Sequence, residues 1–388
     1  MRKVEFGEIA TFSQGQQVSI PDQRTEKFDS CDTFLRIVNY TQNSDDFRYI
    51  PKQSHKHHVS TDDIIMVRYG AVGFVGRGLS GVLANNMFKI NFDKDQVDGN
   101  YLFRTLWSDF VQKQLLNASQ STSMAAINFK TTSKITIPLP QLDQQKKIAT
   151  ILDAADAYRQ KTKVLIEKYD ELTQSLFLDM FGDPVTNPKG WEIISLVNYG
   201  SFKNGLNFGR NESGVKLKYL GVGNFKSFYK IDDLDTLSSV ELNNLPSEGY
   251  LLKDGDLVFV RSNGNKALVG RCIEIICGGT MLTFSGFCIR YRVTSEKVKP
   301  SYLAQLFRNK SFKSLMLQGG RGANIQNINQ KILSEIRIPV PETSLQDKFI
   351  TSIKAIEAQK AQAQASLAQA EDLFNSLLQR AFKGELTN

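Results

Sequence analysis

Polar and basic side chains gather in two pairs of segments, one pair in each half of the chain. In each half, the first segment follows a short apolar run and the second precedes another. The residues in question are Arg68, Tyr69, Arg77, Ser123, Asn128 and Lys130 in the first half, and Arg261, Ser262, Asn263, Asn265, Lys266, Arg271, Arg321, Asn324, Gln326 and Asn327 in the second. Side chains of these types make paired hydrogen bonds to base edges or single contacts to phosphates. Each residue alone fits an ordinary polar loop equally well, but the two pairs of loops as a group favour contact with DNA.

The sequence offers no convincing catalytic or metal-binding set. The only histidines, His55, His57 and His58, lie in one cluster, so no Ser-His-Asp arrangement can be proposed. No carboxylate or cysteine stands at a matching spacing, which favours an exposed loop over a metal site. We therefore expect no metal and no catalytic residue in this chain.

Phosphate-binding and methyltransferase motifs are also missing. No GxxxxGK[ST] string is present. Gly70, Gly73 and Gly76 follow an apolar run, but the intervening Phe74 suits a bulged hairpin better than a phosphate-binding loop. The Asn/Asp-Pro-Pro-aromatic motif of amino-methyltransferases is absent. These observations argue against a cofactor bound by the chain itself.

Two long helices are expected to position the polar segments. Residues 141–182 contain no proline and no glycine before Gly182. An Ile-Pro-aliphatic-Pro motif precedes this stretch, and another precedes residues 342–388. The predicted helix-pairing residues recur in heptads: Ile148, Ile151, Ala155, Tyr158, Leu165, Tyr169, Leu172 and Leu176 in the first stretch, and Phe349, Ile356, Ala363, Ala370, Leu373 and Leu377 in the second. Such spacing predicts a coiled-coil seam on each helix, roughly 60 Å long at about 1.5 Å per residue. Each seam needs a partner, so the two helices are expected to pair.

The chain repeats itself after about 200 residues. Ile-Pro-Leu-Pro at 137–140 and Ile-Pro-Val-Pro at 338–341 are shifted by 201 positions (338 − 137), as are Tyr101 and Tyr302. The segments that end at Arg68 and Arg261 match at a shift of 193 (261 − 68). Loops differ between the copies, whereas strands and helix starts agree. Residues 99–116 are expected to form one amphipathic helix in the first copy.

We therefore predict an α+β protein with a pseudo-twofold internal repeat. Its expected parts are a globular domain at 1–140, a helix at 141–182, a linker at 183–190, a second globular domain at 191–341 and a helix at 342–388. Antiparallel pairing of the helices would put the two globular domains at opposite ends of the pair.

Composition agrees with a DNA partner without requiring one. The net charge of +8 and the pI of about 9.1 suit a polyanion as well as they suit a basic protein that binds no nucleic acid. No run of eighteen apolar residues or signal peptide is apparent, so no membrane contact is expected. Cys31, Cys272, Cys277 and Cys288 form no CxxC pair. Reduced thiols are expected, which fits the cytoplasm.

The order of these parts resembles the specificity subunit of type I restriction–modification systems. The matching stretches are the two Ile-Pro-aliphatic-Pro motifs with Gln145, Lys147 and Ile148 or Gln346 and Lys348, SLFLDMFGD at 175–183, NPKGWEIISL at 187–196 and SLLQRAFKGEL at 376–386. The two strand-Arg-loop units match as well, and the resemblance extends over essentially the whole chain.

The resemblance implies two target recognition domains, each of which reads one half of a split, asymmetric double-stranded DNA sequence. It implies that the helices set the spacing of the half-sites and dock two modification (methyltransferase) subunits, and it allows two restriction subunits. Catalysis, with S-adenosylmethionine, ATP and Mg²⁺, then belongs to those partners. Two alternatives stay open: a coiled-coil adaptor without nucleic acid, and a DNA-modifying enzyme with degenerate motifs.

Overall fold

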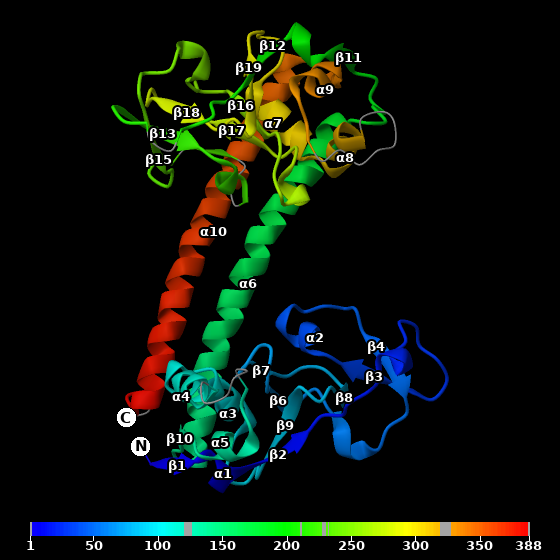
Figure 1. Cartoon of the computed structure of the whole chain (residues 1–388), viewed down its shortest axis with the longest axis vertical. Helices are drawn as coiled ribbons and strands as arrows, with labels where there is room; N and C mark the ends of the chain where they lie inside the picture. The colour runs from blue at the N-terminus through cyan, green and yellow to red at the C-terminus, as the bar shows by residue number, and fades with distance from the viewer. Residues whose placement is uncertain are drawn as a thin grey trace. The chain divides into compact units, whose positions relative to one another are not determined.

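The chain divides into two compact units that each contain parts of both long helices (Figure 1). The computed structural model describes residues 2–119, 126–209, 212–226, 230–231, 233–318 and 327–386. Unit 1 comprises Met1–Lys163 and Gln364–Asn388, and unit 2 comprises Val164–Ala363. Each unit therefore combines one globular segment with one part of each long helix.

The long helices, α6 (Leu142–Phe181) and α10 (Thr343–Lys383), pair in both units. In unit 1, the first half of α6 packs Ile148 and Leu152 into a cluster with Phe374 and Ala381 of α10. In unit 2, the end of α6 meets the start of α10, where Phe349 lies 5.7 Å from Phe177 and 5.1 Å from Phe181 between ring centroids. Within each unit the helices run antiparallel, as the sequence predicted.

Only one of the two predicted heptad sets lies in the helix interface. The first set is buried or half-buried: Ile148, Ala155, Tyr169, Leu176, Phe349, Ile356, Ala363, Ala370 and Leu377. The second set is exposed by 37 to 55%: Ile151, Tyr158, Leu165, Leu172 and Leu373. Their prediction as helix-pairing residues is wrong.

The true second set lies one residue further along each helix. Its members are buried or half-buried: Gln145, Leu152, Arg159, Ile166 and Thr173 in α6, and Gln346, Ile353, Lys360, Leu367 and Phe374 in α10. Several of these side chains are polar or charged and make hydrogen bonds or ion pairs. A heptad pattern of apolar residues does not detect such positions, so the sequence pattern selected the apolar residues one position earlier.

The globular part of unit 1 contains two four-stranded sheets. One has the order β2-β9-β6-β7, from β2 (Ala10–Gln14), β9 (Met87–Phe92), β6 (Ile64–Val67) and β7 (Val75–Gly76). The other has the order β4-β3-β8-β5, from β4 (Arg48–Pro51), β3 (Cys31–Leu35), β8 (Gly81–Leu83) and β5 (His58–Val59). A short pair, β1 (Lys3–Glu5) and β10 (Thr136–Pro138), adjoins them. The helices are α1 (Phe6–Ile9), α2 (Ile37–Thr41), α3 (Gly99–Leu106), α4 (Asp109–Ser119) and α5 (Phe129–Ser133), with 3₁₀ turns η1 (Ile20–Asp22) and η2 (His55–His57).

Unit 2 repeats this plan. Its larger sheet has the order β12-β19-β16-β17-β14, from β12 (Gly200–Asn204), β19 (Cys288–Val293), β16 (Leu257–Val260), β17 (Cys272–Ile275) and β14 (Lys230–Ile231). The smaller has the order β15-β13-β18, from β15 (Ser239–Leu242), β13 (Val215–Leu220) and β18 (Leu282–Phe284), and β11 (Glu192–Ser195) pairs with β20 (Arg337–Val340). The helices are α7 (Pro300–Arg308), α8 (Lys310–Gln318) and α9 (Gln330–Glu335), with 3₁₀ turns η3 (Leu196–Asn198), η4 (Val222–Lys226), η5 (Glu248–Tyr250) and η6 (Lys266–Leu268). The parallel pairs β3–β8 and β13–β18 occupy matching places.

A buried glutamine joins each long helix to its globular segment. The Gln145 side chain accepts a hydrogen bond from Asp98 N (2.8 Å) and donates to Gln96 O (3.0 Å) and Pro140 O (2.9 Å). Gln346 makes the same set with Lys299 N, Lys297 O and Pro341 O, at 2.8, 3.0 and 2.8 Å. Because both amides are fully buried, these bonds fix the direction in which each helix leaves its sheet.

The predicted single helix at 99–116 is wrong, because the chain forms α3 and α4 with a break between them. Ser108 stands at the break, where its hydroxyl donates to Thr105 O at 2.6 Å and accepts from Val111 N at 3.4 Å. Serine satisfies backbone groups with its own side chain and so competes with helix continuation. Asn309 plays the same part between α7 and α8, accepting from Ser311 N and Phe312 N.

Candidate nucleic-acid interface

In unit 2 the described end of the second predicted loop, from residue 327 on, lies beside the first predicted loop. Arg261 follows β16, and its carbonyl oxygen accepts a hydrogen bond from Ile328 N at 2.9 Å. Ser262 and Asn327 form an isolated antiparallel bridge next to it. Ser262 and Asn327 are 65 positions apart in sequence (327 − 262), yet they contribute to one surface.

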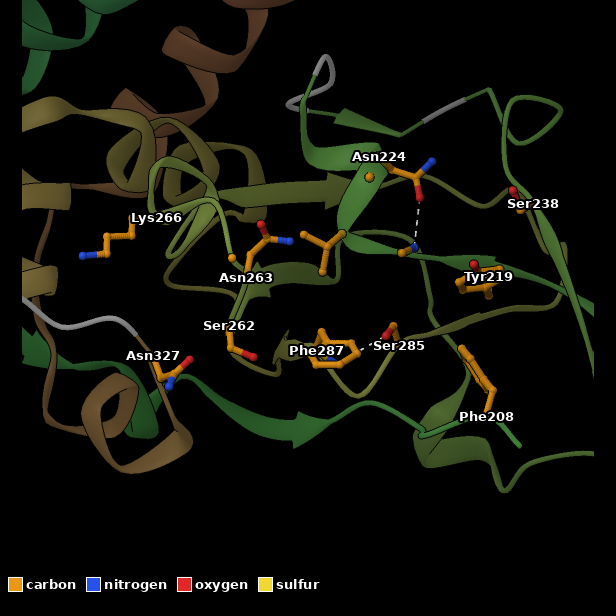
Figure 2. A pocket seen from close by; sticks show the side chains of 14 residues that line it. Phe208, Tyr219, Asn224, Ser238, Ser262, Asn263, Lys266, Ser285, Phe287 and Asn327 are labelled. Atoms are coloured by element: carbon orange, nitrogen blue, oxygen red, sulfur yellow. Dashed lines mark hydrogen bonds between the residues drawn. The ribbon is translucent and has the colours of Figure 1, made fainter. Parts of the chain in front are cut away.

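This surface is hollowed into a concavity of about 820 Å³ (Figure 2). Its walls carry amides, hydroxyls, aromatic rings and one ammonium group, from Phe208, Tyr219, Asn224, Ser238, Ser262, Asn263, Lys266, Ser285, Phe287 and Asn327, with Gly221, Val222, Gly223 and Gly264 between them. An adjoining hollow of about 310 Å³ includes Arg261, Asn207 and Asn329. Such groups can donate to and accept from base edges, while the cation can pair with a phosphate.

Two asparagine side chains of the loop after β16 stabilise the backbone of that loop. The Asn263 side-chain oxygen accepts from Asn265 N at 2.7 Å, and the Asn265 oxygen accepts from Ala267 N at 3.0 Å. These bonds start the 3₁₀ turn η6 and leave Lys266 exposed at its first position. The loop therefore presents its side chains on a defined backbone.

Unit 1 joins its two loops in the same way. Ile127 N donates to Arg68 O at 3.0 Å, and Tyr69 bridges Ala126. The Arg68 guanidinium reaches back to Ile127 O (3.2 Å) and to the Gln14 side-chain oxygen (3.0 Å), so it also braces the surface. Tyr69 is 41% exposed. Both units thus present paired loops at the end of corresponding strands.

The second loop of unit 1 leads into α5, on which two predicted residues lie. The Asn128 side-chain oxygen accepts from Thr131 N at 2.8 Å and caps the helix, as Asn329 caps α9. Asn128 and Lys130 are both exposed next to the bridged strands. An N-cap role and a contact role are compatible here, because the amide nitrogen points away from the cap bond.

Arg77 and Arg271 lie apart from the paired loops. The Arg77 guanidinium stacks 4.3 Å from the Phe103 ring centroid and donates to Asn100 on α3. Arg271 donates to Phe225 O at 2.7 Å and so supports η4. The structure brings neither side chain to the concavity.

Four predicted contact residues, Ser123, Arg321, Asn324 and Gln326, lie outside the described residues. The sequence did not single out several residues of these surfaces, including Gln14, Asn85 and Phe287 and, in the lining of the concavity, Phe208, Tyr219, Asn224, Ser238 and Ser285. Gln14 orients Arg68, Asn85 accepts from the Tyr69 hydroxyl at 3.3 Å, and Phe287 lines both hollows of unit 2. Turn signals at 84–86 and 285–287 precede strands of both units and could have drawn attention to them.

The histidine cluster is partly structural. His58 Nε2 lies 3.0 Å from the Asp32 carboxylate, which also accepts from Gln53 N at 2.7 Å. Burial opposes ionisation of Asp32, but the Gln53 hydrogen bond and His58 together lower its pKa. Across the described ranges, no group of three or more His, Cys, Asp or Glu side chains is arranged to hold a metal ion.

The cysteines are free, and three of them, Cys272, Cys277 and Cys288, are buried. Burial raises the pKa of Cys288 to about 12. Helices within the described part of the chain all lack the length or apolarity needed to cross a membrane.

Comparison with known proteins shows which proteins this chain resembles. Residues 3–168 match the family model of the type I restriction modification DNA specificity domain. The chain is 26% identical over 322 residues to the type I restriction enzyme MjaVIII specificity subunit of Methanocaldococcus jannaschii, covering 77% of this chain and 73% of that one. It is 24% identical over 392 residues to the StySPI specificity subunit of Salmonella potsdam (92% and 83%) and 23% identical over 387 residues to the EcoKI specificity subunit of Escherichia coli (90% and 81%).

Two solved structures share the fold. The S subunit of a type I restriction–modification system from M. genitalium matches with a TM-score of 0.57 at 16% identity, over 98% of this chain and 96% of that one. A chain from a structure on complex assembly and conformational transition of the type I R-M system matches with a TM-score of 0.60 at 16% identity, over 99% and 98%.

Residues 3–168 thus match a DNA specificity domain, and unit 2 repeats the bridged loops of that domain. Over most of its length the chain is similar to specificity subunits of type I restriction–modification systems, and residues 3–168 match the DNA specificity domain of that family.

Proposed function

We propose that this chain is the DNA sequence-recognition subunit of a type I restriction–modification complex, and that each unit reads one half of a bipartite, asymmetric target. The observation that carries the proposal is the duplicated loop bridge, Tyr69–Ala126 in unit 1 and Ser262–Asn327 in unit 2. Both bridges hold a basic residue and neighbouring hydrogen-bonding side chains at the end of equivalent strands. A sequence reader needs such groups on a backbone that does not rearrange when it binds.

Different side chains on the two surfaces support an asymmetric target. Unit 2 presents Ser262 and Asn327 at its bridge, whereas unit 1 has Tyr69 and Ala126 at the matching places. Because base edges differ in their donors and acceptors, these two sets would select different bases. The net charge of +8 adds attraction to phosphates that carries no sequence information.

The long helices would set the spacing between half-sites and dock two modification subunits. Support for docking comes from the exposed apolar positions Ile151, Tyr158, Leu165 and Leu172 on α6 and Leu373 on α10. They recur at seven-residue intervals on α6 and are not used for pairing with α10. Apolar side chains repeated along one helix face suit a helical partner surface.

Catalysis would belong to partner subunits. S-adenosylmethionine and the modification subunits would supply methyl transfer, and ATP, Mg²⁺ and restriction subunits would supply translocation and cleavage. The setting of such a complex is the cytoplasm. This chain's own residues would bind, orient and select DNA.

The test is co-expression with modification subunits from the same system, followed by sequencing of the host DNA for methylated adenine. We expect a single split motif, altered in one half when residues 191–341 are exchanged for those of another family member. Deletion within 141–182 should abolish methylation of this motif, and the unchanged chain serves as the control.

A stable complex that binds S-adenosylmethionine but shows no salt-dependent affinity for any duplex would contradict the proposal and favour a coiled-coil adaptor. Methylation by the isolated chain would instead favour a DNA-modifying enzyme. A motif in which both halves change when 191–341 is exchanged would contradict the assignment of one half-site to each unit.

A further inference from the structure

Phe287 is an exposed aromatic side chain in the middle of a polar surface. It is 60% exposed and lines both hollows of unit 2. In Figure 2 it lies between Ser262 on one side and Ser285 on the other, with Asn327 beyond Ser262. Keeping a phenyl ring in water is unfavourable, so the position of this ring among hydrogen-bonding groups calls for an apolar partner.

The backbone around Phe287 is firmly held. Its carbonyl accepts from Arg261 N at 2.8 Å, and its N–H donates to the Ser285 hydroxyl at 3.3 Å. Gly286 N donates to Leu206 O at 2.6 Å, and a Cβ on Gly286 would come within 2.1 Å of the Asn207 side chain. A side chain at Gly286 would have to displace the Asn207 side chain, so the turn between β18 and β19 is closely packed just before Phe287.

The neighbours of Phe287 suggest what the ring would meet. Arg261 is joined to it through the backbone, and Ser262 and Asn327 line the same concavity. In a complex these polar groups would face base edges. The apolar group that base pairs display in the major groove is the C5-methyl of thymine, which apolar side chains including phenylalanine contact.

We propose that Phe287 reads a thymine in the half-site of unit 2 through contact with its C5-methyl group. This inference rests on the proposed function, since it needs unit 2 to bind DNA. A phenyl ring held beside hydrogen-bonding side chains distinguishes thymine from cytosine and from uracil, which lack that methyl. Phe287 thus adds apolar selection to the polar selection by Ser262 and Asn327.

The experiment uses the complex of the full chain with its modification subunits and duplexes carrying its methylation motif. Each thymine in the unit 2 half is replaced, one at a time, by uracil, which keeps base pairing but lacks the methyl. One replacement should weaken binding about fourfold, the size expected for one buried methyl-sized group. The F287A complex should bind the thymine duplex about tenfold more weakly and should no longer distinguish it from the uracil duplex.

Two further variants serve as controls for the F287A result. F287L keeps an apolar contact and should keep the preference for thymine. Met281→Ala removes a side chain that is 51% exposed just before β18 and lies outside the concavity, and it should bind like the unchanged complex. Thermal unfolding of all three variants checks that the turn is intact.

The proposal is overturned if F287A weakens binding to thymine and uracil duplexes equally, or if the unit 2 half-site contains no A·T pair. An unchanged affinity of F287A for the thymine duplex overturns it as well. A complex without salt-dependent binding to any duplex overturns the proposed function instead, so the two failures are distinguishable.

Discussion

Units 1 and 2 share their internal hydrogen bonds but differ in the residues that face outward. Arg36 N donates to the Asn39 side chain at 2.8 Å in unit 1, and Gly221 N donates to Asn224 at 2.9 Å in unit 2. These equivalent bonds place Gly221 where unit 1 has arginine. The surrounding surface is hollow in unit 2, with Gly221 and Gly223 in its lining.

The same contrast appears at the turn before β9 in unit 1 and the turn before β19 in unit 2. Arg68 N donates to Asn86 O and Arg261 N donates to Phe287 O, both at 2.8 Å. An amide side chain therefore stands in unit 1 where unit 2 has the exposed phenyl ring. The comparison teaches that one scaffold can carry two recognition surfaces, because backbone bonds set the position of a side chain and leave its type free.

The largest effect is expected from the buried glutamines that both units share at the start of their long helices. Gln145→Leu and Gln346→Leu each leave one buried N–H and two carbonyls without their side-chain partner, so each should lower the free energy of unfolding by about 3 kcal/mol. Urea unfolding with hydrogen exchange measures the loss and localises it to unit 1 or unit 2.

The control for these variants is Gln362→Leu, at an exposed position of α10. It should change stability by about 0.5 kcal/mol or less. A large difference between the two buried-glutamine variants would show that the helix junctions are not equivalent.

A substitution toward unit 1 tests the recognition side. A Cβ at Gly223 meets nothing within 4 Å, so Gly223→Val should fold normally while it narrows the concavity. We expect at least tenfold weaker binding of the unit 2 half-site, about 1.4 kcal/mol, with the unit 1 half unchanged.

Binding of duplexes with one half-site altered at a time measures this effect. Gly264→Ala, which also adds a Cβ into open space at the rim, is the smaller-volume control. Unchanged affinity of the Gly223 variant would mean that the concavity does not contact DNA.

The buried tyrosines predict a moderate and equal effect. Tyr101 and Tyr302 donate to Pro138 O and Pro339 O at 2.7 and 2.8 Å, next to the start of each long helix. Tyr101→Phe and Tyr302→Phe should each cost about 1 kcal/mol. Differential scanning calorimetry compares them; a loss confined to one variant would break the equivalence.

The smallest effect concerns a charge cluster of unit 1. Asp156 accepts from Arg104 at 2.9 Å and Arg159 at 2.6 Å. Burial raises its pKa, but the two arginines outweigh burial, and the net pKa lies below the ordinary 3.8. A carboxylate with a lowered pKa stabilises the folded state above its unfolded pKa, and this stabilisation is lost as pH falls through the folded value.

Asp156→Asn should therefore cost about 0.5 to 1 kcal/mol at pH 7, and the difference from the unchanged chain should disappear as the pH falls through the lowered pKa of Asp156. Urea unfolding at several pH values measures it. Glu357→Gln on α10 is the matched control in unit 2. A difference that persists in acid would assign the effect to packing rather than charge.

Sequence alone determined the order of the parts, the internal repeat and the α+β class. The shifts that relate Tyr101 to Tyr302 and Arg68 to Arg261 identified equivalent strands and helix starts, because local patterns of apolar residues, proline and glycine specify elements. It also indicated the paired loops, since basic and amide side chains recur at the same place in both halves.

Only the tertiary structure showed which second set of residues lies in the interface between α6 and α10. It also showed which residues line the concavity of unit 2. Gln145 and Lys360 are buried or half-buried because groups distant in sequence, Asp98 N and the Asp170 carboxylate, bond to them, which no heptad pattern reveals. Phe287 meets Ser262 and Asn327 only after β18, β19 and the loop before α9 come together. Contacts between residues far apart in sequence depend on sheet order and register, and these are fixed by the packing of the whole unit.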